Sequence, residues 1–179
     1  MHPGARETIV IIDFGFSQSQ LIARKVRERG VFSEVVPWDA GYESIMARNP
    51  SGLIIAGGPE MILDEESPSV PEKLLDGSVP VLGICYGMQL IARLLGGDVV
   101  RGKPLGFAMA KILVEGDGGA LLRGLPRELE VWMSHWDRAT SLPPSFALIA
   151  RSESGMIAGF ESPDSRISAV QFLPESAQT

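Results

Sequence analysis

Two hydrophobic patterns alternate along the first half of the chain. Short apolar runs rich in β-branched residues predict buried strands, and segments with apolar positions three or four residues apart predict helices. The predicted strands are 8–13, 31–37, 52–56 and 79–82, and the predicted helices are 19–28, 43–48, 71–75 and 88–95. This alternation predicts a parallel sheet with helices on both faces.

The pattern changes after about residue 98. Five short apolar segments follow, separated by Gly, Pro and Ser, at residues 111–115, 130–133, 147–152, 157–161 and 167–172. They predict an antiparallel or mixed extension of the sheet. The expected fold class is therefore α/β, an open, mostly parallel twisted sheet with flanking helices and a mixed or antiparallel C-terminal extension. We expect residues 1–7 to form a flexible tail and residues 8–179 to form a single domain.

Composition narrows the classes of function. The 179 residues are 45% hydrophobic, carry a formal net charge of −6 and contain one cysteine. The acidic charge argues against general nucleic-acid binding, and no apolar run is long enough for a membrane span. A single cysteine excludes an internal disulfide framework and a cysteine-based zinc site, and we expect no metal site. No signal-peptide pattern is present at the N-terminus, so a cytoplasmic location is expected.

The single cysteine occupies the sequence Gly83-Ile84-Cys85-Tyr86-Gly87, between a predicted strand and a predicted helix. A nucleophile between two glycines on such a turn is typical of the elbow of G-x-S-x-G hydrolases. The turn places the side chain over a helix N-terminus, where the dipole and unpaired N–H groups favour a thiolate. The simpler interpretation is a buried structural cysteine, but the flanking glycines and the strand–helix context favour a nucleophile.

Ligands of open α/β sheets bind beyond the carboxyl ends of the strands. Three segments are predicted there, namely residues 14–18, residues 57–61 and the cysteine elbow. The Gly57-Gly58 pair suits close backbone approach to a ligand, with an N–H group presented to an oxyanion. A second oxyanion donor would be the N–H of Tyr86, the residue after the nucleophile.

The series of motifs along nearly the whole chain resembles the class I glutamine amidotransferases, specifically the amidotransferase domain of GMP synthetases. That family has a flavodoxin-like fold. The segments that carry the resemblance are Ile12-Asp13-Phe14-Gly15, Gln20-Leu21-Ile22-Ala23-Arg24, Gly57-Gly58-Pro59-Glu60, Leu82-Gly83-Ile84-Cys85-Tyr86-Gly87-Met88-Gln89, Leu95-Gly96-Gly97, Val131-Trp132-Met133-Ser134-His135 and Val170-Gln171-Phe172.

The resemblance implies hydrolysis of the glutamine side-chain amide through a cysteine thioester, without a cofactor. It assigns Cys85 as the nucleophile and the N–H groups of Gly58 and Tyr86 as oxyanion donors. The residues implied to hold the amino-acid end of glutamine are Gln89, Ser134, His135 and Trp136. The resemblance also implies a partner, an ATP-pyrophosphatase synthetase domain or subunit that uses the ammonia to convert XMP to GMP. The chain itself has no Walker A sequence and no pyrophosphatase loop.

The C-terminal motif departs from the family pattern. Where the family has His-Pro-Glu, this chain has Leu173-Pro174-Glu175. Leucine cannot take a proton from the thiol or give one to leaving ammonia, and Glu175 has no imidazole to orient. Because a cysteine and its histidine act as a unit, we expect glutaminase activity to be weak or absent.

Further departures lie near the expected pocket. Trp136 stands where the family usually has glycine, and residues 105–108, Leu-Gly-Phe-Ala, replace a polar stretch. His135 could substitute as the base only if it lay within hydrogen-bond reach of Cys85, and a histidine with no such role is the favoured interpretation. Asp13 and Asp137 could be acids at the site, although we expect them to satisfy local backbone donors.

Three functional hypotheses remain open. The first is an amidotransferase domain with full or partial glutaminase activity. The second is a catalytically inactive domain of the same fold that binds glutamine or a partner. The third, ranked lowest, is an elbow-cysteine α/β protein of a different family, because such a protein would share the elbow but not the other motifs.

Overall fold

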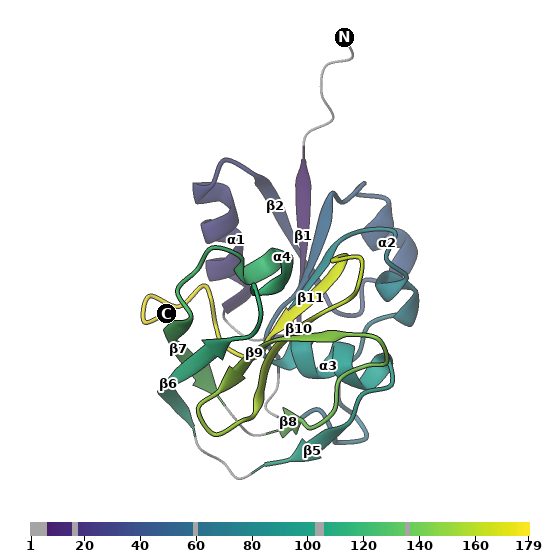
Figure 1. The fold of residues 1–179 in the computed structure, drawn as a ribbon. Helices are drawn as coiled ribbons and strands as arrows, with labels where there is room; N and C mark the ends of the chain where they lie inside the picture. The colour runs from purple at the N-terminus through teal and green to yellow at the C-terminus, as the bar shows by residue number, and fades with distance from the viewer. Residues whose placement is uncertain (1–6, 16–17, 59–60, 103–105, 135–136) are drawn as a thin grey trace.

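The computed structural model describes residues 7–15, 18–58, 61–102, 106–134 and 137–179. Of the expected tail, residues 1–7, only Glu7 lies within the described residues. A nine-stranded sheet crosses the molecule in the order β2-β1-β3-β4-β11-β10-β9-β6-β7 (Figure 1). Its strands are β1 (Thr8–Asp13), β2 (Phe32–Pro37), β3 (Gly52–Ile55), β4 (Val81–Ile84), β6 (Phe107–Val114), β7 (Glu128–Ser134), β9 (Ala147–Ser152), β10 (Ile157–Glu161) and β11 (Ile167–Val170).

The sheet has a parallel half and an antiparallel half. Strands β2, β1, β3, β4 and β11 pair in parallel, whereas β10, β9, β6 and β7 continue the sheet in antiparallel pairs. The inner strands of the parallel half, β1, β3, β4 and β11, are short and mostly buried, whereas the edge strand β2 is only partly buried. The predicted α/β sheet with an antiparallel extension is therefore confirmed.

Helices cover both faces of the parallel half. Helix α1 (Gln18–Glu28) and the one-turn helix α4 (Gly119–Leu122) pack on one face, together with the core around Ile11, Ile54 and Ile84. Helices α2 (Tyr42–Met46) and α3 (Tyr86–Leu94) and the 3₁₀ turn Glu72–Leu75 pack on the other face, around Val10, Ile12 and Ile55. Figure 1 shows α1 and α4 on the opposite side of the sheet from α2 and α3.

Two features of the fold were not predicted. Strands β5 (Val99–Arg101) and β8 (Asp137–Ala139) form a separate antiparallel pair, and α4 occupies a stretch that the sequence pattern leaves as a turn. In addition, the last predicted strand ends at Val170 rather than at residue 172. Beyond it, Phe172 forms an isolated bridge to Met133 of β7, which directs the C-terminal segment across the end of the sheet.

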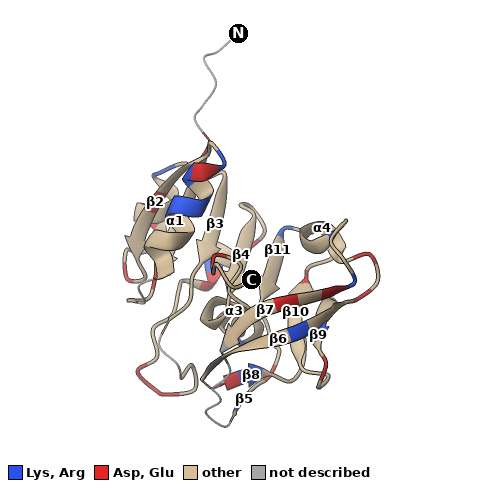
Figure 2. Ribbon diagram, turned by 90° about the vertical axis from the view of Figure 1, so that its left-hand side faces the viewer, with Lys and Arg blue, Asp and Glu red and all other residues tan. Residues whose placement is uncertain are grey.

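Charged positions are mixed over the surface elements in the view of Figure 2. Basic positions on α1 and β6 alternate there with acidic positions on β7 and in the loops. On this side, the described elements show no continuous basic stripe of the kind that follows a nucleic-acid backbone. Among the described residues, none of the helices combines the length and the apolar character that a membrane crossing requires.

Candidate active site

Cys85 lies at the sharp turn between β4 and α3, as the elbow pattern predicts. Its backbone has φ 55° and ψ −105°, a conformation that residues with a side chain seldom adopt. The turn is held because the Cys85 N–H donates to the Val170 carbonyl, at 2.8 Å, and the Cys85 carbonyl accepts from Met88 and Gln89 in the first turn of α3. The strained conformation is thus fixed from both sides, and it presents the thiol at the carboxyl edge of the parallel strands.

The two elbow glycines are required by close packing. A Cβ atom on Gly83 would lie 2.5 Å from Cδ1 of Ile91 and 2.8 Å from the Gly87 carbonyl. A Cβ atom on Gly87 would overlap the Ile55 carbonyl of β3. The glycines therefore allow α3 to press directly on the sheet, which explains their place on both sides of the nucleophile.

The surroundings of the thiol oppose its ionisation. Burial raises the pKa of Cys85 to about 12; the negative charge of Glu175 acts in the same direction, while hydrogen bonds from the Tyr86 N–H and the Gln171 side chain lower it. The N–H of Tyr86 at the helix start favours the thiolate, as the sequence predicts, but burial has the larger and opposite effect. At neutral pH the thiol is protonated and needs a base to become a nucleophile.

The two expected oxyanion donors lie side by side. Gly58 packs so closely on Tyr86 that a Cβ atom there would be 2.9 Å from the tyrosine ring and from the Cβ of Phe14. The Tyr86 N–H belongs to the first turn of α3, where the helix provides no acceptor. The Tyr86 hydroxyl donates to the Pro68 carbonyl at 2.5 Å, so the tyrosine joins the elbow to the loop that follows Gly58. Gly58 and the first turn of α3 are therefore in contact, and the role of their N–H groups as oxyanion donors stays a prediction.

The C-terminal segment brings Leu173 and Glu175 to the same region. Leu173 is buried among the apolar residues of the α1 face, and its N–H donates to the Trp132 carbonyl at 2.9 Å. Glu175 is also buried, and neither of its carboxyl oxygens has a hydrogen-bond partner among the described residues. Burial raises the pKa of Glu175 to about 7. Among the residues that the structure describes, this buried carboxyl group therefore has no imidazole to orient.

Two buried glutamines lie between the nucleophile and β8. Gln89 of α3 donates from Nε2 to the Asp137 carbonyl at 2.7 Å and to Oε1 of Gln171 at 3.3 Å. Gln171 in turn donates from Nε2 to Sγ of Cys85 at 3.6 Å. The sequence singled out Gln89 as a substrate-binding residue but missed any role for Gln171. The signal that could have identified Gln171 is a polar residue directly after a buried parallel strand.

Three predicted site residues lie wholly or partly outside the described part of the chain. Ser134 ends β7, but its side chain is not described, and His135 and Trp136 lie outside the described residues. Their predicted role in holding glutamine, and the alternative of His135 as the base, remain predictions. Of the substituted stretch 105–108, Leu105 and the side chain of Phe107 are likewise not described.

The two aspartates have different roles. Asp13 accepts from the nearby Gly15 N–H at 3.1 Å and from the Ser19 hydroxyl at 2.7 Å, which confirms the expected local role. Asp137 is fully buried and its Oδ2 accepts from the N–H of Ile62, 75 positions away in sequence, at 2.9 Å. The local interpretation of Asp137 was therefore wrong: its carboxylate connects β8 to a distant loop.

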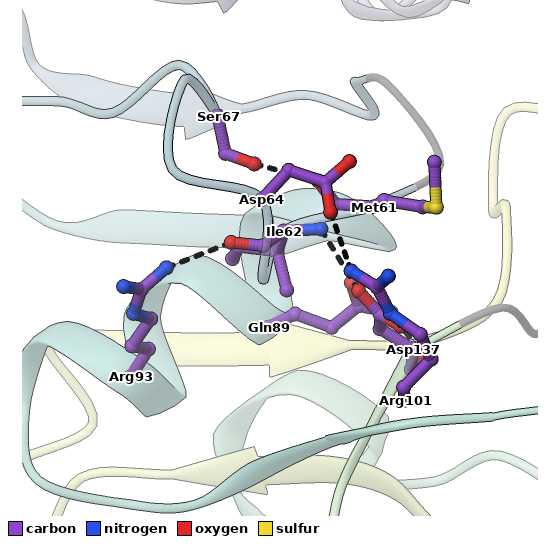
Figure 3. Close-up of polar contacts among 8 residues, drawn as sticks. All are labelled: Met61, Ile62, Asp64, Ser67, Gln89, Arg93, Arg101 and Asp137. Carbon is purple, nitrogen blue, oxygen red and sulfur yellow. Dashed lines mark hydrogen bonds and ion pairs between the residues drawn. The ribbon is translucent and has the colours of Figure 1, made fainter.

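That loop, residues 61–68, is held by a set of contacts that the sequence did not indicate (Figure 3). The backbone of Ile62 is bonded on both sides, because its N–H donates to Asp137 and its carbonyl accepts from Nη1 of Arg93 at 2.7 Å. Arg101 of β5 pairs with Asp64 at 2.5 Å. These contacts fix the loop 61–68 relative to β5, β8 and the elbow helix, which carries Arg93.

Comparison with known proteins agrees with this geometry. A family model described as glutamine amidotransferase class I matches residues 10–179. The glutamine-hydrolyzing GMP synthase of Parafrankia sp. (strain EAN1pec) is 45% identical over 174 residues, which cover 97% of this chain and 32% of the relative. The enzyme of the same name from Fusobacterium nucleatum is 44% identical over 167 residues, 93% of this chain and 32% of the relative. The chain thus spans about a third of the length of these relatives.

Solved structures show the same fold. A protein from Thermoplasma acidophilum, described as one subunit of a GMP synthase, superposes with a TM-score of 0.86 at 33% identity, covering 98% of this chain and 88% of its own. A glutamine amidotransferase from Thermotoga maritima, at 22% identity and a TM-score of 0.76, shares the fold. With a match over nearly its whole length and a cysteine elbow in the expected place, the chain belongs to the class I glutamine amidotransferase family and is similar to the GMP synthases within it.

Proposed function

We propose that this chain is the glutamine-binding domain of a GMP synthase system and that its own glutaminase activity is strongly impaired. The relatives are named glutamine-hydrolyzing GMP synthases, so the reaction considered is hydrolysis of glutamine to glutamate and ammonia. The ammonia would pass to a synthetase partner that aminates XMP to GMP.

Glutamine hydrolysis through a thioester requires a nucleophile, oxyanion donors and a group that transfers protons. Sγ of Cys85 would attack the side-chain amide carbon of glutamine, and Gly58 and Tyr86 would stabilise the oxyanion. Expulsion of ammonia requires the thiol proton to reach the amide nitrogen, and water then converts the thioester to glutamate and regenerates the thiol. Both proton transfers need a group that can accept and return a proton beside the sulfur.

One observation carries the proposal of impaired activity. Glu175 is buried with both oxygens unpartnered among the described residues, and the buried Leu173 occupies the position of the missing imidazole in the motif. Leucine has no proton to exchange, while burial keeps the pKa of the Cys85 thiol near 12. The nucleophile is therefore in place, but its proton has no acceptor at position 173.

A glutaminase assay tests this proposal directly. We expect the unmodified chain to release ammonia from glutamine at a rate hardly above that of a Cys85→Ala variant, since loss of a general acid–base costs about 10²–10⁴-fold. Steady release at an enzyme-like rate that disappears in Cys85→Ala would contradict the proposal.

Restoring the imidazole gives a second test. We expect Leu173→His to raise ammonia release by about 10²-fold over the unmodified chain, because the new imidazole would have Glu175 as its partner. We expect activity still below that of an active relative, since Trp136 and residues 105–108 also depart from the family pattern. Full recovery from this single change would show that those departures are harmless.

A binding function without turnover is the second candidate. The raised pKa of the half-buried thiol and the intact elbow favour it, because glutamine can occupy the site without reacting. Calorimetric titration with glutamine should then show binding to the unmodified chain and to Cys85→Ala. A chain that binds no glutamine in either form would exclude this candidate.

A further inference from the structure

The register of the two central strands places Gln171 beside the nucleophile. Strands β4 and β11 are parallel neighbours with Ile84 opposite Val170, so the next residues, Cys85 and Gln171, leave the sheet at the same edge. Gln171 is buried, and its own N–H donates to the Ala158 carbonyl of β10 at 2.9 Å, which fixes its backbone. The side chain then reaches Cys85, with 3.6 Å between Nε2 and Sγ.

The hydrogen-bond network determines which end of the Gln171 amide faces the sulfur. The Asp137 backbone carbonyl can only accept, so the Gln89 amide must turn its Nε2 toward it, and Figure 3 shows Gln89 extending from α3 to Asp137. The same nitrogen gives its second hydrogen to Gln171, which therefore presents Oε1 to Gln89. Nε2 of Gln171 is the end that remains, and it points at Cys85.

We propose that Gln171 is a further catalytic residue, an amide donor that stabilises the Cys85 sulfur as it gains negative charge. This inference rests on the proposed use of Cys85 as the nucleophile. A hydrogen bond to a charged atom is roughly twice as strong as one between neutral groups, so the Gln171 bond strengthens when the thiol loses its proton.

The neighbouring charge makes this donor important. Glu175 is the ionisable side chain whose negative charge opposes ionisation of Cys85, and at position 173 leucine supplies no compensating cation. Among the described residues, the groups that stabilise the charged sulfur are two neutral donors, the Tyr86 N–H at the helix start and the Gln171 amide. The first is a backbone group, so Gln171 is the one of the two that a substitution can remove.

The experiment measures the rate at which iodoacetamide alkylates Cys85, the single cysteine of the chain. The reagent forms an S–C bond, releases iodide and passes the thiol proton to the buffer, so its rate follows the thiolate fraction. We expect Gln171→Leu to react about tenfold more slowly at every pH below the thiol pKa. Gln171→Glu keeps the shape but replaces the donor by an acceptor, and it should be slower still.

A matched control is the same substitution elsewhere. Gln20→Leu changes an exposed residue of α1 and should leave the alkylation rate unchanged. Rates for both Gln171 variants within about twofold of the unmodified chain would overturn the inference. Slowing in Gln171→Glu alone would also overturn it, since that result reports repulsion by the new carboxylate rather than loss of a donor.

Failure of the proposed function has a different signature. A chloroketone built on the glutamine skeleton should label Cys85 faster than iodoacetamide does if the site binds glutamine. If the chloroketone shows no such preference, the proposal that the site binds glutamine is wrong. The effect of Gln171 on the rate of alkylation by iodoacetamide would be unaffected, because iodoacetamide carries no glutamine group.

Discussion

At the scale of single residues, Glu175 is the most unusual side chain of the site. It is a buried carboxyl group with no hydrogen-bond partner among the described residues, and burial raises its pKa from 4.5 to about 7. A carboxyl group with a raised pKa in the folded state keeps its proton there at a pH where the unfolded chain has lost it. Its contribution to stability is therefore complete below about pH 4.5 and disappears as the pH rises to about 7.

Replacing Glu175 by glutamine should remove this pH dependence. We expect Glu175→Gln to increase the free energy of unfolding above pH 7 by about 3 kcal/mol, and to change it little below pH 4.5. Urea unfolding of both proteins across this range measures the difference. Equal stability of the two proteins at high pH would mean that Glu175 is ionised at little cost, in contradiction to its raised pKa.

Glu161 provides a control, because its pKa is shifted in the opposite direction to that of Glu175. It is also buried, but its carboxylate accepts hydrogen bonds from the N–H groups of Ala120 and Leu121 and from the hydroxyls of Ser165 and Ser168. Burial alone would raise its pKa, yet these hydrogen bonds outweigh burial and lower it. Glu161→Gln should therefore destabilise the protein at neutral pH and lose this effect as the pH falls, the reverse of the change at Glu175.

At the scale of elements, the loop 61–68 depends on contacts from α3, β5 and β8. Arg93→Ala removes the donor to the Ile62 carbonyl and leaves the Asp137 contact in place. We expect a loss of about 1 kcal/mol in stability and faster amide hydrogen exchange in this loop, with the parallel strands still protected. Exchange measured by mass spectrometry distinguishes the loop from the strands.

The matched control for this substitution is Arg24→Ala. Arg24 pairs with Glu28 at 2.8 Å on the exposed side of α1, one turn apart in sequence. Such exposed pairs contribute about 0.3–0.5 kcal/mol, and no loop depends on this one. Equal exchange in loop 61–68 for both arginine variants would show that Arg93 does not hold the loop.

The sequence predicts the elements that depend on local pattern and misses those that depend on distant partners. The strands β1 to β4, α1 and the elbow helix were predicted, because each has its own apolar pattern, whereas β11 was predicted as part of the extension and instead pairs in parallel with β4. Helix α4 was missed because Gly118 and Gly119 have positive φ and look like a turn, while its first N–H groups bond to Glu161, some forty positions away. The pair β5–β8 was missed for the same reason, as neither strand has a pattern of its own.

The residues of the candidate site likewise fall into those that a local motif identifies and those that depend on distant partners. The elbow glycines and Cys85 are defined by adjacent residues, so the sequence was sufficient to identify them. The pKa of the thiol depends on Glu175 and Gln171, which are about ninety positions away, and on burial that no local pattern reports. The roles of Gln171 and Arg93 likewise follow from strand register and a loop contact rather than from a motif.

At the scale of the whole molecule, the chain matches one part of its longer relatives. It spans about a third of the length of the GMP synthases it resembles, and its sequence has no motif that could activate XMP with ATP. Its sheet gathers the elbow, the Gly58 loop and Gln171 at one edge, where we propose that glutamine binds. Amination would have to take place on a synthetase domain or subunit, which we propose as the partner.

Reconstitution with such a partner separates supply of ammonia from its use. With ATP, XMP and an excess of ammonium, we expect the synthetase part of a relative to form GMP whether or not this chain is present. With glutamine instead, the unmodified chain should support little GMP formation, because Leu173 cannot move the proton that ammonia release requires. Leu173→His should increase glutamine-dependent formation by about 10²-fold, and Leu173→His combined with Cys85→Ala should lose that gain. Rapid glutamine-dependent synthesis with the unmodified chain would contradict the proposal of impaired activity. If the chain alone still released little ammonia, the partner would supply the missing base.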